Sequence, residues 1–129
     1  MRILLDTHVL IWAVGDSDRL VPDIIEELQD ASNDVLFSAA SIWEIAIKYR
    51  LKRPRFPHEP NDIARAALGT GFAELPVRAA AAASVSTLPL HHRDPFDRLL
   101  IAQAISEPAL FYTADAALEP YSDLVKRIA

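Results

Sequence analysis

Short apolar blocks and stretches of helical periodicity follow one another along the chain. The apolar blocks are typical of buried strands, and they occupy residues 3–5, 35–37, 72–75, 109–113 and 124–128. Helical spacing follows Thr7 and predicts further helices at residues 22–31, 39–51, 77–86 and 95–106, with another that ends near residue 69. Strands that alternate with helices predict an α/β fold, in which a parallel sheet is covered by helices on both faces.

Polar residues that favour helix starts stand before several of these stretches. Ser38 precedes the longest one, and Asp94 is followed by Pro95, a residue that is common at the first helical position. The helix that ends near residue 69 is predicted to be capped by Asn61 or Asp62. The starts of three helices are therefore predicted from capping chemistry.

The composition narrows the chemistry that the chain can perform. It has 129 residues, of which 51% are hydrophobic, so we expect one globular domain that spans residues 1–129. The absence of cysteine excludes disulfides, zinc–thiolate sites and cysteine nucleophiles, and is compatible with a cytoplasmic protein. Glycine is scarce, and no glycine-rich loop of the kind that binds nucleotide phosphates is present.

The net charge of −5 argues against binding of nucleic acid over the whole surface. Any contact with nucleic acid should therefore use a local basic patch. The stretch KYRLKRPR at residues 48–55 is the candidate for such a patch. A solvated loop or a dimer contact is an equally good interpretation of that stretch.

The apolar start of the chain resembles a signal peptide only at first sight. Asp6 and His8 interrupt it, and no small-residue cleavage site follows. No apolar run is long enough to span a membrane. We therefore expect a soluble protein that does not bind membranes.

Two acidic residues stand at the carboxyl ends of predicted strands. Asp6 follows the first strand, and Asp115 follows the strand predicted at residues 109–113. Taken singly, each is explained as a helix cap or a turn residue. Open α/β sheets, however, bind ligands outside the carboxyl ends of their strands, where both acids would lie.

Two further acids lie on helix faces that are otherwise apolar. Glu44 is surrounded by apolar residues and has only Lys48 as a salt-bridge partner, so we expect it to be at least half buried. Asp97 lies in a first helical turn, where the helix dipole favours an acid, but its face continues into Leu100. Asp94 is explained by its role as a cap, and we rank it below Asp97.

Carboxylates gathered from four segments repel one another unless a cation neutralises them. In a doubly wound sheet, the four acids named above would meet at one edge. Oxygen ligands suit Mg²⁺ or Mn²⁺, which can support phosphodiester hydrolysis. The four histidines show no metal-ligand spacing, although His92 could reach the pocket through the turn at Asp94.

Four segments resemble the PIN-domain ribonucleases, and in particular the VapC-like toxins of bacterial toxin–antitoxin pairs. They are LLDTHVLIW at the start, SAASIWEIAIKYRLK in the middle, HHRDPFDRLLIAQA and finally YTAD. The resemblance covers the whole chain, in the family's order and at roughly its spacing. It implies a PIN-like three-layer fold, in which a five-stranded parallel sheet lies between helices. It also implies a metal-dependent endoribonuclease activity.

The resemblance assigns roles to the acids. The first and third positions, which are Asp6 and Asp97, are the usual metal ligands of the family. We expect them to bind Mg²⁺ or Mn²⁺ directly, and we expect Glu44 and Asp115 to complete the catalytic pocket through water or a second ion. Asp115 occupies the family's least constant position.

The resemblance also implies supporting residues and partners. Thr7 and Thr113 would contribute hydroxyls behind the metal ligands, and Asp94 would assist them. The implied partners are an RNA substrate, a VapB-like antitoxin whose C-terminal segment blocks the pocket, and a second copy of the chain in a homodimer. The aromatic residues considered for such contacts, although each is more often a core residue, are Trp12, Trp43 and Tyr49.

Three other functions stay open from the residues. A phosphoacceptor receiver module would need an acidic pair after the first strand and an acceptor aspartate after the third, where this chain has Asp-Thr-His and Ala-Glu-Leu-Pro. A non-catalytic module would use the pocket only to receive an antitoxin arginine. A Mg²⁺ phosphatase would need an aspartate two residues after Asp6, where the chain has His8.

Overall fold

A five-stranded parallel sheet forms the centre of the computed structural model, which describes residues 1–129. The strands are β1 (Arg2–Leu5), β2 (Asp34–Ser38), β3 (Ala73–Leu75), β4 (Leu110–Thr113) and β5 (Val125–Arg127). Their order across the sheet is β3-β2-β1-β4-β5. The α/β class and the five-stranded parallel sheet are therefore confirmed.

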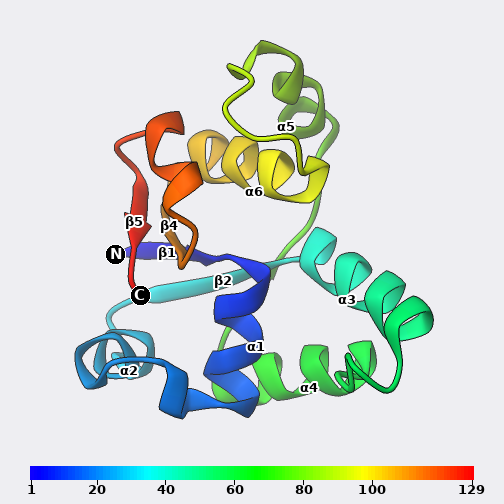
Figure 1. The fold of residues 1–129 in the computed structure, drawn as a ribbon. Coiled ribbons are helices and arrows are strands. Elements are labelled where there is room, and N and C mark those ends of the chain that lie inside the picture. Colours follow the sequence, from blue (N-terminus) through cyan, green and yellow to red (C-terminus); the bar gives the residue numbers. More distant parts are fainter.

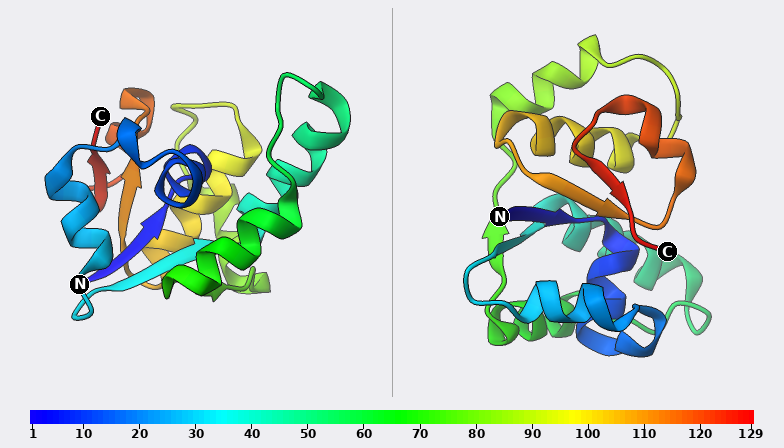
Figure 2. Two further views of the ribbon diagram at one scale, coloured as in Figure 1. Left: turned by 90° about the horizontal axis from the view of Figure 1, so that it is seen from below. Right: turned by 90° about the vertical axis from the view of Figure 1, so that its left-hand side faces the viewer.

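Helices cover both faces of this sheet. The α-helices are α1 (Thr7–Gly15), α2 (Pro22–Gln29), α3 (Ala39–Lys52), α4 (Pro60–Thr70), α5 (Ala79–Ser84) and α6 (Pro95–Ser106), and the 3₁₀ helices are η1 (Ser17–Arg19), η2 (Val85–Thr87) and η3 (Ala116–Tyr121). Helices α1, α2 and α4 lie on one side of the sheet, and α5 and α6 lie on the other (Figures 1 and 2). None of the helices is both long and apolar enough to cross a membrane.

Alternate residues of the central strand pack into two separate cores. Ile3 and Leu5 belong to the core that is shared with α1, α2 and α4, whereas Leu4 belongs to the core that is shared with α6. All three side chains are fully buried. A central parallel strand that is buried on both faces reads as a continuous apolar run, which explains the segment ILL.

Two of the three predicted caps are confirmed. The Ser38 hydroxyl accepts a hydrogen bond from the N–H of Ala40 at 3.0 Å and begins α3. Asp94 Oδ1 accepts the N–H of Phe96 at 2.9 Å and begins α6. Both starts were predicted correctly because the capping residue stands next to the backbone groups that it satisfies.

The other cap and one helix differ from the prediction. Helix α4 is capped by Glu59, whose carboxylate accepts the N–H groups of Asn61 and Asp62 at 2.9 and 3.2 Å. Pro60 then occupies the first helical position, so the helix begins two or three residues earlier than expected. The helix predicted at residues 77–86 is divided into α5 and the 3₁₀ helix η2.

The strand order creates a switch point between β1 and β4. The chain runs outward from β1 to β2 and β3, and then returns to place β4 on the opposite side of β1. Ligands of open α/β sheets bind at the carboxyl edge of such a point. The order also differs from the 2-1-3-4-5 order of flavodoxin-like sheets, so the receiver interpretation has no support from the topology.

Candidate active site

Three of the predicted acids meet at the carboxyl edge of the sheet. Asp6 joins β1 to α1, Glu44 lies in the second turn of α3, and Asp97 lies in the first turn of α6. The helices α1, α3 and α6 all begin on that side of the sheet (Figure 1). The acids are close enough to interact, because the charges of Asp6 and Glu44 both raise the pKa of Asp97.

Asp6 is held firmly in a buried position. It is 6% exposed, and this burial raises the pKa of its carboxyl. The Thr113 hydroxyl, at the end of β4, donates a 2.6 Å hydrogen bond to Asp6 Oδ2 and opposes that shift. The backbone N–H of Asp6 donates to the carbonyl of Tyr112 at 2.9 Å. The pairing of β1 with β4 thus continues up to the acid and fixes its place.

Glu44 is 4% exposed, so the burial predicted from its apolar helix face is confirmed. Its Oε1 accepts a 2.7 Å hydrogen bond from the Thr7 hydroxyl, and its Oε2 pairs with Lys48 Nζ at 2.7 Å. The Ser41 hydroxyl lies 2.9 Å from that of Thr7. Thr7 therefore contacts Glu44, and the predicted Glu44–Lys48 pair is present.

The acidity of Asp97 is also shifted by its surroundings. Burial of its carboxyl, followed by the charges of Asp6, Asp94 and Glu44, raises its pKa to about 7. The imidazole of His92 acts in the opposite direction. Near neutral pH the carboxyl of Asp97 is divided between its neutral and charged forms, and a bound cation would favour the charged form.

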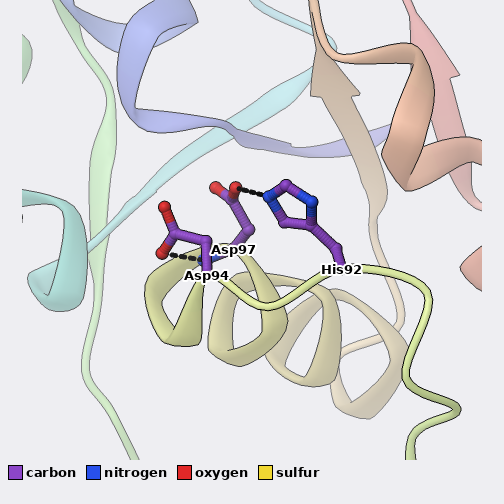
Figure 3. A group of neighbouring side chains, drawn as sticks. All are labelled: His92, Asp94 and Asp97. Carbon is purple, nitrogen blue, oxygen red and sulfur yellow. Dashed lines mark hydrogen bonds and ion pairs between the residues drawn. The ribbon is translucent and has the colours of Figure 1, made fainter.

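A group formed by His92, Asp94 and Asp97 lies at the start of α6 (Figure 3). One potential ligand atom from each residue lies within 4.8 Å of the others. His92 Nε2 is 3.0 Å from Asp97 Oδ2, and the N–H of Asp97 donates to Asp94 Oδ1 at 3.4 Å. Asp94 is therefore both the helix cap and a neighbour of the acidic pocket. Asp6 and Glu44 lie outside this group.

The sequence contains only a weak indication that His92 lies beside the acids. This residue has no metal-ligand spacing and lies in a loop. The signal that pointed to it was its place two residues before the cap of α6, from which the chain folds back over the first helical turn. This contact depends on the path of the loop, and a loop has no periodic sequence pattern from which its path could be predicted.

Asp115 lies at the rim of the pocket. Its side chain is 43% exposed, and its Oδ1 accepts the N–H of Ala117 at 2.9 Å, which caps η3. Its Oδ2 is 4.0 Å from His92 Nε2, and its backbone N–H donates to the Thr113 hydroxyl at 3.0 Å. Asp115 is thus a cap, as the simplest interpretation predicted, and its part in catalysis stays a prediction.

A cavity of about 430 Å³ opens between α3 and the start of α6, and Glu44 is the one of the four acids that lines it. Its lining residues are Glu44, Ile47, Lys48, Arg93, Asp94, Pro95 and Phe96. A larger cavity of about 570 Å³ lies at the other edge of the sheet, where the strands begin, and none of the four acids lines it. Since Glu44 and Asp94 line the smaller cavity, we assign the entrance of the candidate site to it.

The basic stretch at residues 48–55 does not form one uniform patch. Lys48 is neutralised by Glu44, and the guanidinium of Arg53 lies 4.6 Å from the ring centre of Tyr49. The cations that remain free of such contacts lie on the last turn of α3 and in the loop after it. Trp43, on the same helix, is 62% exposed, so the interpretation of this residue as core is wrong.

The chain is similar to known proteins in sequence and in fold. Ribonuclease VapC16 of Mycobacterium tuberculosis is 52% identical over 48 residues, which cover 33% of this chain and 33% of that relative. The similarity thus spans about a third of the relative's length. The structure of VapBC2 from Rickettsia felis bound to a DNA fragment from their promoter matches 98% of both chains with a TM-score of 0.74 and 15% identity, which shows a shared fold. Residues 3–123 match the family described as PIN domain. Because that match spans nearly the whole chain, the protein belongs to the PIN domain family.

Proposed function

We propose that this protein is a metal-dependent endoribonuclease and the toxin of a toxin–antitoxin pair. The observation that carries the proposal is the convergence of Asp6, Glu44 and Asp97. Burial, followed by the charges of neighbouring carboxylates, raises the pKa of Asp97 to about 7. Buried carboxylates that repel one another at the carboxyl edge of a sheet are expected where a divalent cation binds.

The residues fit Mg²⁺ or Mn²⁺, both of which prefer oxygen ligands. We propose Asp6 and Asp97 as direct ligands. Asp97 Oδ1 has no hydrogen-bond partner in the protein, whereas Oδ2 is held by His92. Both oxygens of Glu44 are engaged by side chains of the protein, so Glu44 would act through water or a second ion, as would Asp115 at the rim.

The chain's own residues prepare the pocket for hydrolysis. When bound, a divalent cation lowers the pKa of a coordinated water and stabilises charge that develops at phosphorus. Thr113 fixes Asp6, and Thr7 fixes Glu44, so these two carboxylates need little rearrangement. RNA would approach from the cavity beside Lys48 and Arg93.

The names of the relatives support a proposal for the biological setting. One is named a ribonuclease, and the structural neighbour is a VapBC pair on promoter DNA. We therefore propose RNA as substrate, a VapB-like antitoxin as partner, a homodimer as assembly and the cytoplasm as location. In the basic stretch, Arg50, Lys52 and Arg55 would guide the RNA backbone, because Lys48 is paired with Glu44.

Cleavage of RNA by the purified protein, with Mn²⁺ or Mg²⁺ and again with EDTA, tests this function. We expect Asp6→Asn and Asp97→Asn each to slow cleavage by roughly 100-fold or more, because each removes a charge that holds the cation. Asp123→Asn is the matched control, since Asp123 is exposed and lies away from the pocket residues. Sequencing the ends of the cleaved RNA would identify the target.

Unchanged cleavage in either pocket variant would contradict the ligand assignments. A growth assay separates catalysis from partner binding, because Asp97→Asn should abolish growth arrest and still bind the antitoxin. Growth arrest that persists in this variant would instead favour a non-catalytic module.

A further inference from the structure

Asp6, Glu44 and Asp97 each form a hydrogen bond with a side chain from another segment of the chain. The pairs are Thr113 with Asp6 at 2.6 Å, Thr7 with Glu44 at 2.7 Å and His92 with Asp97 at 3.0 Å. The two threonines are buried on regular elements, so their positions follow from the sheet and from α1. His92 lies in a loop between η2 and α6. The position of His92 must therefore depend on contacts between this loop and other segments.

Arg98 ties this loop to α6. It follows Asp97 in the helix, and its guanidinium donates to the carbonyls of Pro89, Val85 and Leu88 at 2.9, 3.2 and 3.4 Å. No carboxylate lies within ion-pair distance of Arg98, so its donors serve the loop backbone. The irregular segment before α6 is thus fastened to the turn that carries Asp97.

The Tyr121 hydroxyl completes the fastening. It accepts the backbone N–H of His92 at 2.8 Å and an N–H of Arg98 at 3.1 Å. Tyr121 is buried at the end of η3, the short helix that Asp115 caps. One hydroxyl therefore joins the loop, α6 and η3, and these three segments carry His92, Asp97 and Asp115.

We propose that His92 is a positioning residue of the metal site and that Tyr121 and Arg98 place it there. The proposal rests on the metal-dependent function proposed above. A cation on Asp97 requires the ionised carboxylate, so His92 Nε2–H donates to Oδ2 and leaves Oδ1 in a fixed direction toward the ion. Partners that orient a ligand in this way typically contribute 10–100-fold to metal affinity, an order of magnitude taken from other metal sites.

Mn²⁺ affinity in the absence of RNA, measured by calorimetry or by the electron paramagnetic resonance of free Mn²⁺, tests the proposal. We expect His92→Ala to weaken binding by about 10–100-fold. His92→Gln should recover part of the loss, because its amide can also donate. Tyr121→Phe should weaken binding in the same direction by less. Leu90→Ala, in the same loop and 72% exposed, should bind Mn²⁺ as the unmodified protein does.

RNA cleavage supplies a second measurement. In His92→Ala, the Mn²⁺ concentration for half-maximal rate should rise, while the KM for RNA at saturating Mn²⁺ should stay unchanged. A loss that excess Mn²⁺ does not restore would contradict a role in metal binding. Should His92→Ala fail to fold in thermal melts, His92→Gln and Tyr121→Phe carry the test, and unmodified Mn²⁺ affinity in both would overturn the proposal.

The two proposals fail in different ways. If Asp97→Asn loses Mn²⁺ while His92→Ala binds it as tightly as the unmodified protein, the role of His92 is wrong and the proposed function stands. If the unmodified protein binds no Mn²⁺, the metal-dependent function is wrong, and the role of His92 is wrong with it.

Discussion

Replacing Asp97 by asparagine should stabilise the protein in the absence of metal, although it should abolish activity. The carboxyl of Asp97 has its pKa raised from 3.8 to about 7, chiefly by burial and then by neighbouring carboxylates. When the pKa of an acid is higher in the folded than in the unfolded protein, the free energy of unfolding falls as the pH rises from the unfolded pKa to the folded pKa. Above about pH 7 the folded protein therefore carries the full cost of the charge.

The size of the effect follows from the shift. It is about three pKa units, and each unit corresponds to about 1.4 kcal/mol, so the upper limit is about 4 kcal/mol. The side chain is 15% exposed and its charge is shared with Asp6 and Glu44, so we expect about 1–3 kcal/mol. For a chain of this size, that corresponds to a melting temperature higher by about 3–10 °C.

Urea denaturation and calorimetry in EDTA would measure the difference at pH 8 and at pH 5. At pH 5 only about 1.2 of the roughly three pH units between the unfolded and the folded pKa of Asp97 have been crossed, so the advantage of Asp97→Asn should fall to about 40% of its value at pH 8. Adding Mn²⁺ at pH 8 should stabilise the unmodified protein by about 2.7 kcal/mol at 100 times the dissociation constant, and should leave the variant unchanged.

Asp123→Asn controls for the removal of one negative charge and should show no such dependence on pH. An Asp97→Asn protein that is no more stable than the unmodified one at pH 8, or whose advantage is the same at pH 5, would refute the reasoning. It would mean that the pocket does not make ionisation of Asp97 unfavourable.

Three further substitutions probe the groups that hold the acids. Thr113→Val removes the hydrogen bond that opposes the raised pKa of Asp6, so it should raise that pKa further, weaken Mn²⁺ binding in titrations and cost about 1–2 kcal/mol in urea denaturation. Lys48→Met leaves the buried Glu44 without its cation and should cost about 1–3 kcal/mol at pH 7.5, whereas a change smaller than the error of the urea curves would mean that the pair contributes little. Ser38→Ala removes the cap of α3 and should lower the free energy of unfolding by about 1–2 kcal/mol, measured in the same way.

Local patterns in the chain were sufficient for most elements of the fold. The segment ILL predicted β1 because a strand that is buried on both faces cannot tolerate polar residues. Ser38 and Asp94 predicted the starts of α3 and α6 because a cap acts within three residues of itself. The burial of Glu44 followed from its apolar helix face, since helical periodicity places those neighbours around it.

Contacts between distant segments followed from the tertiary arrangement. The side of β1 on which β4 pairs depends on the crossover, and that pairing brings Thr113 to Asp6 across 107 positions of sequence. Thr7 reaches Glu44 because α1 packs against α3. The residues next to each contact in the sequence show no pattern that predicts it.

The path of an irregular loop is the hardest feature to read from sequence. His92 has no periodic neighbours. Its place beside Asp97 depends on hydrogen bonds that Arg98 donates to backbone carbonyls and on one that the Tyr121 hydroxyl accepts from a backbone N–H. Every residue carries such backbone groups, so they leave no signature in the sequence. The acids and the order of elements could thus be predicted from the chain, because they depend on residue type and local spacing. The contacts that orient the acids could not, because they depend on where separate segments meet in space.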